Sequence, residues 1–195
     1  MGIYIRKFMK TKFILHGGFK PGQTEEDNSK FYNEILKDAP EGAKILLVCF
    51  AKDTERVSAA TTKVMAEFNK NKCQKEITFE IASEESFVEQ VKFADVIYLH
   101  GGRTLKLLDT LKRFTNLKEL FSGKIVAGES AGANVLGKFC YSPSADEVIE
   151  CLGILPIKII PHYSEEYRGK LDEVGQELEM LFLPEYQFKV FYSEL

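Results

Sequence analysis

The sequence predicts an α/β protein, a three-layer α/β/α sandwich around a mostly parallel sheet. Short apolar runs typical of strands alternate with amphipathic helical segments, and the connections between them are short. The runs at residues 44–50 and 94–99 are apolar on both faces, as central parallel strands are. With 195 residues, 45% of them hydrophobic, the chain is long enough to bury a substantial core. We therefore expect one domain, residues 1–195.

The predicted strands come from short apolar runs that end at glycine, proline or polar residues. The run at residues 76–81 alternates apolar and polar side chains, which places it nearer an edge of the sheet. Residues 141–147 read as a polar loop, and the apolar residues 148–155 could pair at an edge. The predicted strands cover residues 13–18, 44–50, 76–81, 94–99, 124–128, 157–162 and 187–192.

The predicted helices come from apolar side chains at helical spacing. A turn at Pro21-Gly22 precedes the first helix, and the segment 38–42, which contains proline and glycine, ends it. The last helix is predicted in spite of Gly169 and Gly175. The predicted helices cover residues 25–37, 54–71, 86–92, 105–111, 131–137 and 165–182.

Charge and cysteine usage exclude several classes of partner. The net charge is −3 and the lysines are scattered among glutamates, so a nucleic-acid partner is not expected. No apolar run is long enough to cross a bilayer, and residues 1–10 lack the apolar core of a signal peptide. The four cysteines have no CxxC spacing, which favours thiols in a reducing compartment. We expect a cytoplasmic protein without a membrane partner.

The segment 124–137 (KIVAGESAGANVLG) contains the candidate nucleophile around which the other site residues are considered. An apolar strand ends in the pentapeptide G-E-S-A-G, and a helix of small residues follows at once. In such a G-x-S-x-G turn the glycines flank the serine because a Cβ there would clash with the neighbouring strand or helix. The hydroxyl of Ser130 is then pushed out of the sheet, with helical N–H groups directed to the same place. Ser130 is the predicted nucleophile.

A serine nucleophile requires a base, and histidine suits that task near neutral pH. The chain has three histidines, His16, His100 and His162, and each ends a predicted strand at the same edge of the sheet. An isolated histidine at a strand end can also be purely structural. We favour His162 as the base because it follows Ser130 by 32 residues, on a strand expected to lie beside the nucleophile's strand.

An oxyanion hole requires two preorganised N–H donors. Ala131, at the start of the helix, can supply one. The turn Gly101-Gly102, which follows the strand at residues 94–99, can supply the other. Arg103 comes next and is a candidate to contact a substrate carboxylate, an expectation based on charge and position alone.

The acid that would orient His162 is not fixed by the sequence. Six carboxylates are near enough in sequence, and we favour Asp146 or Glu147 because the loop between nucleophile and base can bring them to His162. These candidates are Asp146, Glu147, Glu150, Glu165, Glu166 and Glu185. The histidines have no metal-ligand spacing and the phosphate-binding glycine motifs are missing from the sequence, so neither a metal nor another cofactor is expected.

Three ordered motifs resemble a known family. They are residues 98–108 (YLHGGRTLKLL), residues 128–134 (GESAGAN) and residues 152–163 (LGILPIKIIPHY). Together they resemble the serine peptidase family of aspartyl dipeptidase (dipeptidase E) and cyanophycinase, which has the class I glutamine amidotransferase-like (flavodoxin-like) fold. The resemblance implies Ser130 as nucleophile, His162 as base, and Gly102 with Ala131 as oxyanion donors. Arg103 departs from the Asn or Asp that often follows the paired glycines in the family.

The expected function is that of a serine peptidase-like hydrolase. The substrate would be a small peptide, cleaved by a dipeptidase or exopeptidase through an acyl-enzyme, with Gly101 and Arg103 near the substrate. One alternative is an esterase of the α/β-hydrolase type, although the chain leaves little room for the long segment that such folds place between serine and histidine. The other is a catalytically silent, amidotransferase-like binding protein. A homodimer is left open.

Overall fold

The computed structural model describes residues 10–19 and 26–194. Among these residues, the main sheet has six strands in the order β10-β1-β5-β4-β2-β3, and only β10 runs antiparallel to its neighbour. The strands are β1 (Thr11–His16), β2 (Ala43–Val48), β3 (Ile77–Ile81), β4 (Val96–Leu99), β5 (Ile125–Glu129) and β10 (Phe188–Ser193). The predicted mostly parallel sheet is therefore confirmed, with β3 at an edge as its alternating pattern indicated. Residues 1–9, Glu25 and the predicted turn at Pro21-Gly22 lie outside the described residues.

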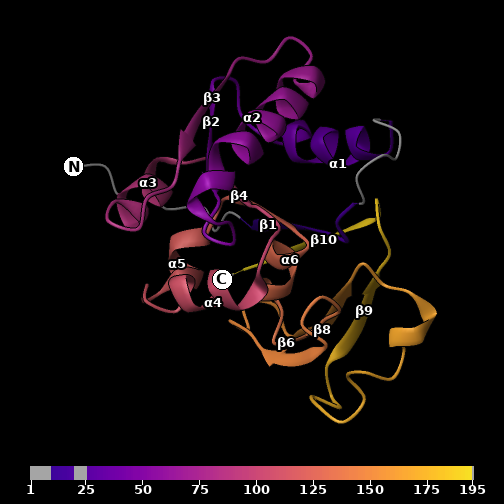
Figure 1. Cartoon of the computed structure of the whole chain (residues 1–195). Coiled ribbons are helices and arrows are strands. Elements are labelled where there is room, and N and C mark those ends of the chain that lie inside the picture. Colours follow the sequence, from indigo (N-terminus) through magenta and orange to yellow (C-terminus); the bar gives the residue numbers. More distant parts are fainter. Residues whose placement is uncertain (1–9, 20–25, 195) are drawn as a thin grey trace.

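Helices cover both faces of the main sheet (Figure 1). One face packs against α1 and α2 through a cluster that includes Phe31 and Phe68. The other face packs against α3 to α6 through a second cluster that includes Phe87 and Leu107. These two clusters are the two interfaces of the predicted sandwich. The helices are α1 (Glu26–Lys37), α2 (Thr54–Asn71), α3 (Phe87–Phe93), α4 (Thr104–Leu111), α5 (Leu117–Phe121) and α6 (Ala131–Leu136).

A second sheet, which the sequence did not predict, lies beyond α6 (Figure 1). Its strand order is β7-β6-β8-β9, and its apolar side chains continue the cluster around α6. The expectation that the strand before His162 lies beside the nucleophile's strand is wrong, because β1 and β4 flank β5 while β8 belongs to the second sheet. The strands are β6 (Phe139–Ser142), β7 (Glu147–Glu150), β8 (Ile157–Pro161) and β9 (Glu179–Leu183).

The long helix predicted over residues 165–182 is also wrong. The chain forms a single 3₁₀ turn at Glu165–Tyr167, then further turns, and enters β9 at Glu179. Gly175 has a φ of 49°, in the left-handed region that a right-handed helix does not pass through. Leu181 and Leu183 are buried on β9, so the apolar residues that suggested a helical stripe pack instead on the second sheet. No helix in the described part of the chain is long and apolar enough to cross a membrane.

Candidate active site

Ser130 stands at a sharp turn between β5 and α6. Its backbone has φ 52° and ψ −107°, a conformation that L-residues rarely adopt. The two flanking positions must be glycine because neighbouring backbone atoms lie too close to admit a side chain. A Cβ on Gly128 would lie 2.4 Å from the carbonyl oxygen of Gly132, and a Cβ on Gly132 would lie 2.0 Å from the carbonyl oxygen of Leu99. The strand, turn and helix predicted from the pentapeptide are confirmed, together with the reason for both glycines.

Alanine at position 132 is expected to lower the free energy of unfolding by about 3 kcal/mol or more, because α6 would have to move away from β4 to admit the methyl group. Urea unfolding checks this. The matched control is Gly169→Ala, whose Cβ would meet nothing closer than Asp172 Oδ2 at 3.5 Å. We expect the control to stay within about 0.5 kcal/mol of the wild type. Equal unfolding midpoints for the two variants would contradict the steric argument.

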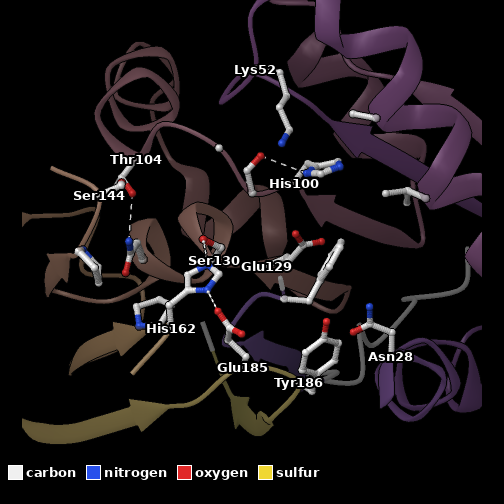
Figure 2. A pocket seen from close by; sticks show the side chains of 18 of the residues that line it. Asn28, Lys52, His100, Thr104, Glu129, Ser130, Ser144, His162, Glu185 and Tyr186 are labelled. Atoms are coloured by element: carbon white, nitrogen blue, oxygen red, sulfur yellow. Dashed lines mark hydrogen bonds and ion pairs between the residues drawn. The ribbon is translucent and has the colours of Figure 1, made fainter. Parts of the chain in front are cut away.

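His162 follows β8 directly, and Figure 2 shows its ring between Ser130 and Glu185. Its Nε2 lies 2.9 Å from Ser130 Oγ. The backbone at His162 has φ 51°, and its N–H donates to the carbonyl oxygen of Gly17 over 2.8 Å. A Cβ on Gly18 would lie 2.4 Å from the imidazole ring, so that glycine leaves the space the ring occupies. The turn after β1, and not a neighbouring parallel strand, therefore places the histidine.

The carboxylate that contacts His162 is Glu185, not Asp146. Glu185 Oε1 lies 2.9 Å from His162 Nδ1, and the glutamate side chain is 16% exposed (Figure 2). Asp146 accepts hydrogen bonds from Tyr141 Oη at 2.6 Å and Lys170 Nζ at 3.0 Å, on the exposed turn between β6 and β7. The expectation for Asp146 is wrong because the β6-β7 hairpin carries this turn away from the base.

Backbone hydrogen bonds hold the segment around Glu185 against the turn after β1. The N–H of Tyr186 donates to the carbonyl oxygen of Gly18 over 2.9 Å, and the N–H of Gly17 donates to the carbonyl oxygen of Gln187 over 2.9 Å. The same Gly17-Gly18 turn thus holds both His162 and Glu185. With Glu185 accepting the proton on Nδ1, Nε2 is left as the acceptor for the serine hydroxyl.

The Gly101-Gly102 turn borders Ser130, as predicted. A Cβ on Gly101 would lie 3.2 Å from the serine Cβ, and Gly102 has a φ of 153° with no room for a Cβ beside Ala51. Ala131 begins α6 immediately after the serine and is fully buried. The turn and the start of the helix are therefore both next to the serine, and the oxyanion role of Gly102 and Ala131 stays a prediction.

Arg103 does not lie at the cavity. Its N–H donates to the carbonyl oxygen of Ala51, and its guanidinium forms an ion pair with Asp53 at the exposed surface. The turn at Gly102 directs the arginine outward, and Arg103 is not among the residues that line the cavity. The expectation that Arg103 contacts a substrate carboxylate is therefore wrong, because its guanidinium pairs with Asp53 outside the cavity.

A cavity of about 1390 Å³ opens above Ser130. Its floor is formed by the ends of β4 and β5, one wall by α2, and the opposite wall by the segments that follow β6, β8 and β9. Its lining residues include Lys52, Glu55, His100, Glu129, Ser130 and Ser144. Among the described residues, no three His, Cys, Asp or Glu side chains are grouped so as to hold a metal ion.

The two remaining histidines follow or end strands β4 and β1 of the main sheet, whereas His162 follows β8 of the second sheet. His16 is fully buried and its Nδ1 accepts a hydrogen bond from the N–H of Gly18 over 3.0 Å. Burial lowers the pKa of His16 to about 4, although the nearby Glu129 carboxylate opposes this. Burial also lowers the pKa of His100. Both imidazoles are therefore neutral at pH 7, and neither touches Ser130 as His162 does.

Sequence reasoning missed the roles of Glu185 and Gly18. Glu185 was one of six open carboxylates, and the expected helix over residues 165–182 obscured the strand that leads to it. A signal was present, because the apolar run at residues 180–183 ends at Pro184, as a short strand would. Nothing local indicates that Gly18 lies under an imidazole from the other sheet.

The fold and the hydrogen-bonded Ser130, His162 and Glu185 together have the arrangement of a serine hydrolase built on an α/β sheet. The model of "Peptidase family S51" matches residues 13–182. The chain belongs to this family, so the resemblance noted in the sequence is confirmed.

Individual relatives found by sequence similarity carry the name peptidase E. Peptidase E of Shewanella amazonensis is 33% identical over 86 residues, which are 40% of this chain and 37% of that protein. Peptidase E of Shewanella oneidensis is 36% identical over 90 residues, 42% of this chain and 38% of that protein. The chain thus spans less than half the length of the curated relatives it matches.

Two solved structures share the fold. A peptidase from an acI-B1 actinobacterium superposes with a TM-score of 0.68 at 22% identity, covering 97% of this chain and 86% of the other. The crystal structure titled as a peptidase E protein from Listeria monocytogenes EGD-e superposes with a TM-score of 0.66 at 18% identity. The match covers 95% of this chain and 99% of that one. At these identities the likeness concerns the fold alone.

Proposed function

We propose that this protein is a serine peptidase, a dipeptidase or exopeptidase that cleaves small peptides through an acyl-enzyme. The observation that carries the proposal is the continuous set of hydrogen bonds from Ser130 Oγ through the His162 ring to Glu185, at the floor of a cavity. The names of the Shewanella relatives, peptidase E, support the same class of reaction. A cavity of this size accommodates a peptide of a few residues.

In the proposed mechanism His162 Nε2 takes the proton from Ser130 Oγ while the oxygen attacks the scissile carbonyl carbon. The N–H groups of Gly102 and Ala131 receive the oxyanion. His162 then gives its proton to the leaving amine, and the peptide C–N bond breaks. Water, deprotonated by His162, hydrolyses the resulting ester, and the proton returns to Ser130. Glu185 stabilises the imidazolium throughout, and no cofactor takes part.

A fluorophosphonate probe tests this proposal directly. It is expected to label the folded wild-type protein once, and peptide mapping by mass spectrometry should place the adduct on Ser130. A panel of dipeptides with different N-terminal residues, assayed in parallel, should contain substrates. Without labelling or cleavage the protein would be a silent binding member of the family. Rapid turnover of simple acyl esters with no dipeptide cleavage would instead indicate an esterase.

We also propose that the protein resides in the cytoplasm. All four cysteines are thiols, and Sγ of Cys140 lies 3.4 Å from Sγ of Cys151 in the interior of the second sheet. Two thiols this close are compatible with a reducing compartment, whereas an oxidising one favours disulfides. Fractionation of cells that express the protein checks this, and recovery from a secreted fraction would overturn it.

A further inference from the structure

His16, the last residue of β1, is a buried imidazole that takes no part in the reaction steps given above. Its ring packs against Phe31 of α1, with the ring centroids 4.4 Å apart. An apolar side chain would fill this place without the cost of burying a polar group. What the imidazole adds is an acceptor, because its Nδ1 receives the N–H of Gly18 over 3.0 Å. This bond runs from a side chain to the backbone two residues further on, as in an Asx turn, and it closes the turn that follows β1.

The turn closed in this way holds three segments of the site together. Three consecutive carbonyl oxygens, those of residues 16, 17 and 18, each accept an N–H from a different part of the chain. The first donor follows β5, the second follows β8, and the third lies in the link between β9 and β10. In that order the donors are Ser130 at 3.0 Å, His162 at 2.8 Å, and Tyr186, the residue after Glu185, at 2.9 Å. A shift of this backbone would therefore move the nucleophile, the base and the acid relative to one another.

The two glycines of the turn make it dependent on such a bond. Gly17 and Gly18 have the widest choice of backbone conformation, and Gly18 has a φ of 90°. Neither position can be stiffened by a larger residue. A Cβ on Gly17 would lie 2.1 Å from the carbonyl oxygen of Pro184, and a Cβ on Gly18 would lie 2.4 Å from the ring of His162. The Nδ1 of His16 restricts the pair from the preceding residue, without adding a side chain to either position.

We propose that His16 is a positioning residue: its Nδ1 fixes the turn whose carbonyl oxygens hold the base and the acid in place beside the nucleophile. This inference rests on the proposed serine chemistry and adds a residue on which its rate depends. At neutral pH the ring is uncharged, because burial lowers the pKa of His16 to about 4, and the N–H of Gly18 selects the tautomer in which Nδ1 accepts. Since His16 is not among the described residues that line the cavity, its loss should lower kcat more than it changes KM.

The test compares two substitutions of nearly equal size and shape, His16→Asn and His16→Leu. The Oδ1 of asparagine is as many bonds from the backbone as the Nδ1 of histidine, so it can accept the same N–H, whereas leucine cannot. We expect kcat of His16→Leu on the best dipeptide of the panel to fall roughly 10- to 100-fold, because misplacing reacting groups by about 1 Å can cost roughly 10²-fold. His16→Asn should stay within about threefold of the wild type.

Proton NMR supplies a readout that a purely structural role would not move. The Nδ1–H of His162, hydrogen-bonded to the carboxylate of Glu185, should give a resonance far downfield of the amide region. Its chemical shift should be the same in the wild type and His16→Asn, and it should move or broaden in His16→Leu. The control for packing is Phe31→Leu, which trims the ring beside His16 but keeps the acceptor. This control should lower the urea midpoint while kcat stays within about threefold of the wild type.

A folded His16→Leu protein with the wild-type kcat would overturn the inference while the serine chemistry stands, and so would an unshifted resonance of His162. The inference would also fail if Phe31→Leu lost as much kcat as His16→Leu, since packing and not the acceptor would then matter. If His16→Leu does not fold, His16→Asn decides: a folded protein that has lost about tenfold or more in kcat overturns the inference. A wild type that a fluorophosphonate does not modify would overturn the proposed function, on which the inference rests.

Discussion

Replacing Ser130 with alanine is expected to lower kcat/KM for dipeptide cleavage by roughly 10⁴- to 10⁶-fold. The alanine keeps the Cβ and the strained backbone at this turn, so the fold should be retained while the nucleophilic oxygen is lost. The steady-state rates of both proteins on the best dipeptide of the panel measure the effect. Thermal unfolding, in the same buffer, verifies that the variant is folded.

Ser144→Ala serves as the control for this experiment. Ser144 is an exposed serine that lines the same cavity, and no described contact joins it to His162. Its replacement should change kcat/KM by less than about threefold, on the scale of an exposed, non-reacting contact. A Ser130→Ala protein that keeps the wild-type rate would refute the nucleophile and, with it, the peptidase mechanism.

Glutamine at position 185 is expected to lower kcat by about 10³- to 10⁴-fold. The amide has nearly the shape of the carboxylate but carries no charge, so it cannot stabilise the imidazolium that forms when His162 takes the serine proton. It can also donate to Nδ1, which would leave the proton on Nε2 and point an N–H at Ser130 Oγ. The effect should appear in kcat with a smaller change in KM, since the contact described for Glu185 is with the base.

Asp146→Asn is the matched comparison for the acid. It removes the same charge from the residue that the sequence favoured, which in the structure bonds Tyr141 and Lys170. Because Asp146 is exposed and does not touch His162, we expect kcat within about threefold of the wild type. If Asp146→Asn were the damaging substitution and Glu185→Gln the harmless one, the assignment drawn from the hydrogen bond to Nδ1 would be wrong.

The sequence predicted those features of the site that are encoded locally. The turn at Ser130 can be recognised from five consecutive residues, because the two glycines that it requires, Gly128 and Gly132, both lie within that pentapeptide. The ends of β1 and β4 meet at one edge of the sheet because alternating strands and helices produce parallel strands. All three histidines close a short buried strand, and His162 was favoured because it follows Ser130 by 32 residues on a strand expected beside the nucleophile's strand. The choice was right although that strand lies in a different sheet.

The parts that could not be predicted depend on contacts between distant segments. Glu185 is one carboxylate among many on the chain, and the short apolar run before it indicates a strand but not a contact with His162. Its role depends on the hydrogen bond between the N–H of Tyr186 and the carbonyl oxygen of Gly18. Local patterns do not encode such a pairing. Arg103 was misjudged for a related reason, because its partner, Asp53, belongs to another strand-helix connection.

The location of Glu185 has a consequence for when the three hydrogen-bonded residues come together during synthesis of the chain. The glutamate lies in the short link between β9, a strand of the second sheet, and β10, which closes the main sheet against β1. The pairing of β10 with β1 and the placement of Glu185 beside His162 therefore involve the same short segment of the chain. During synthesis Ser130 and His162 are added to the chain before Glu185. A nascent chain that ends before residue 185 therefore lacks the carboxylate that the proposed mechanism requires.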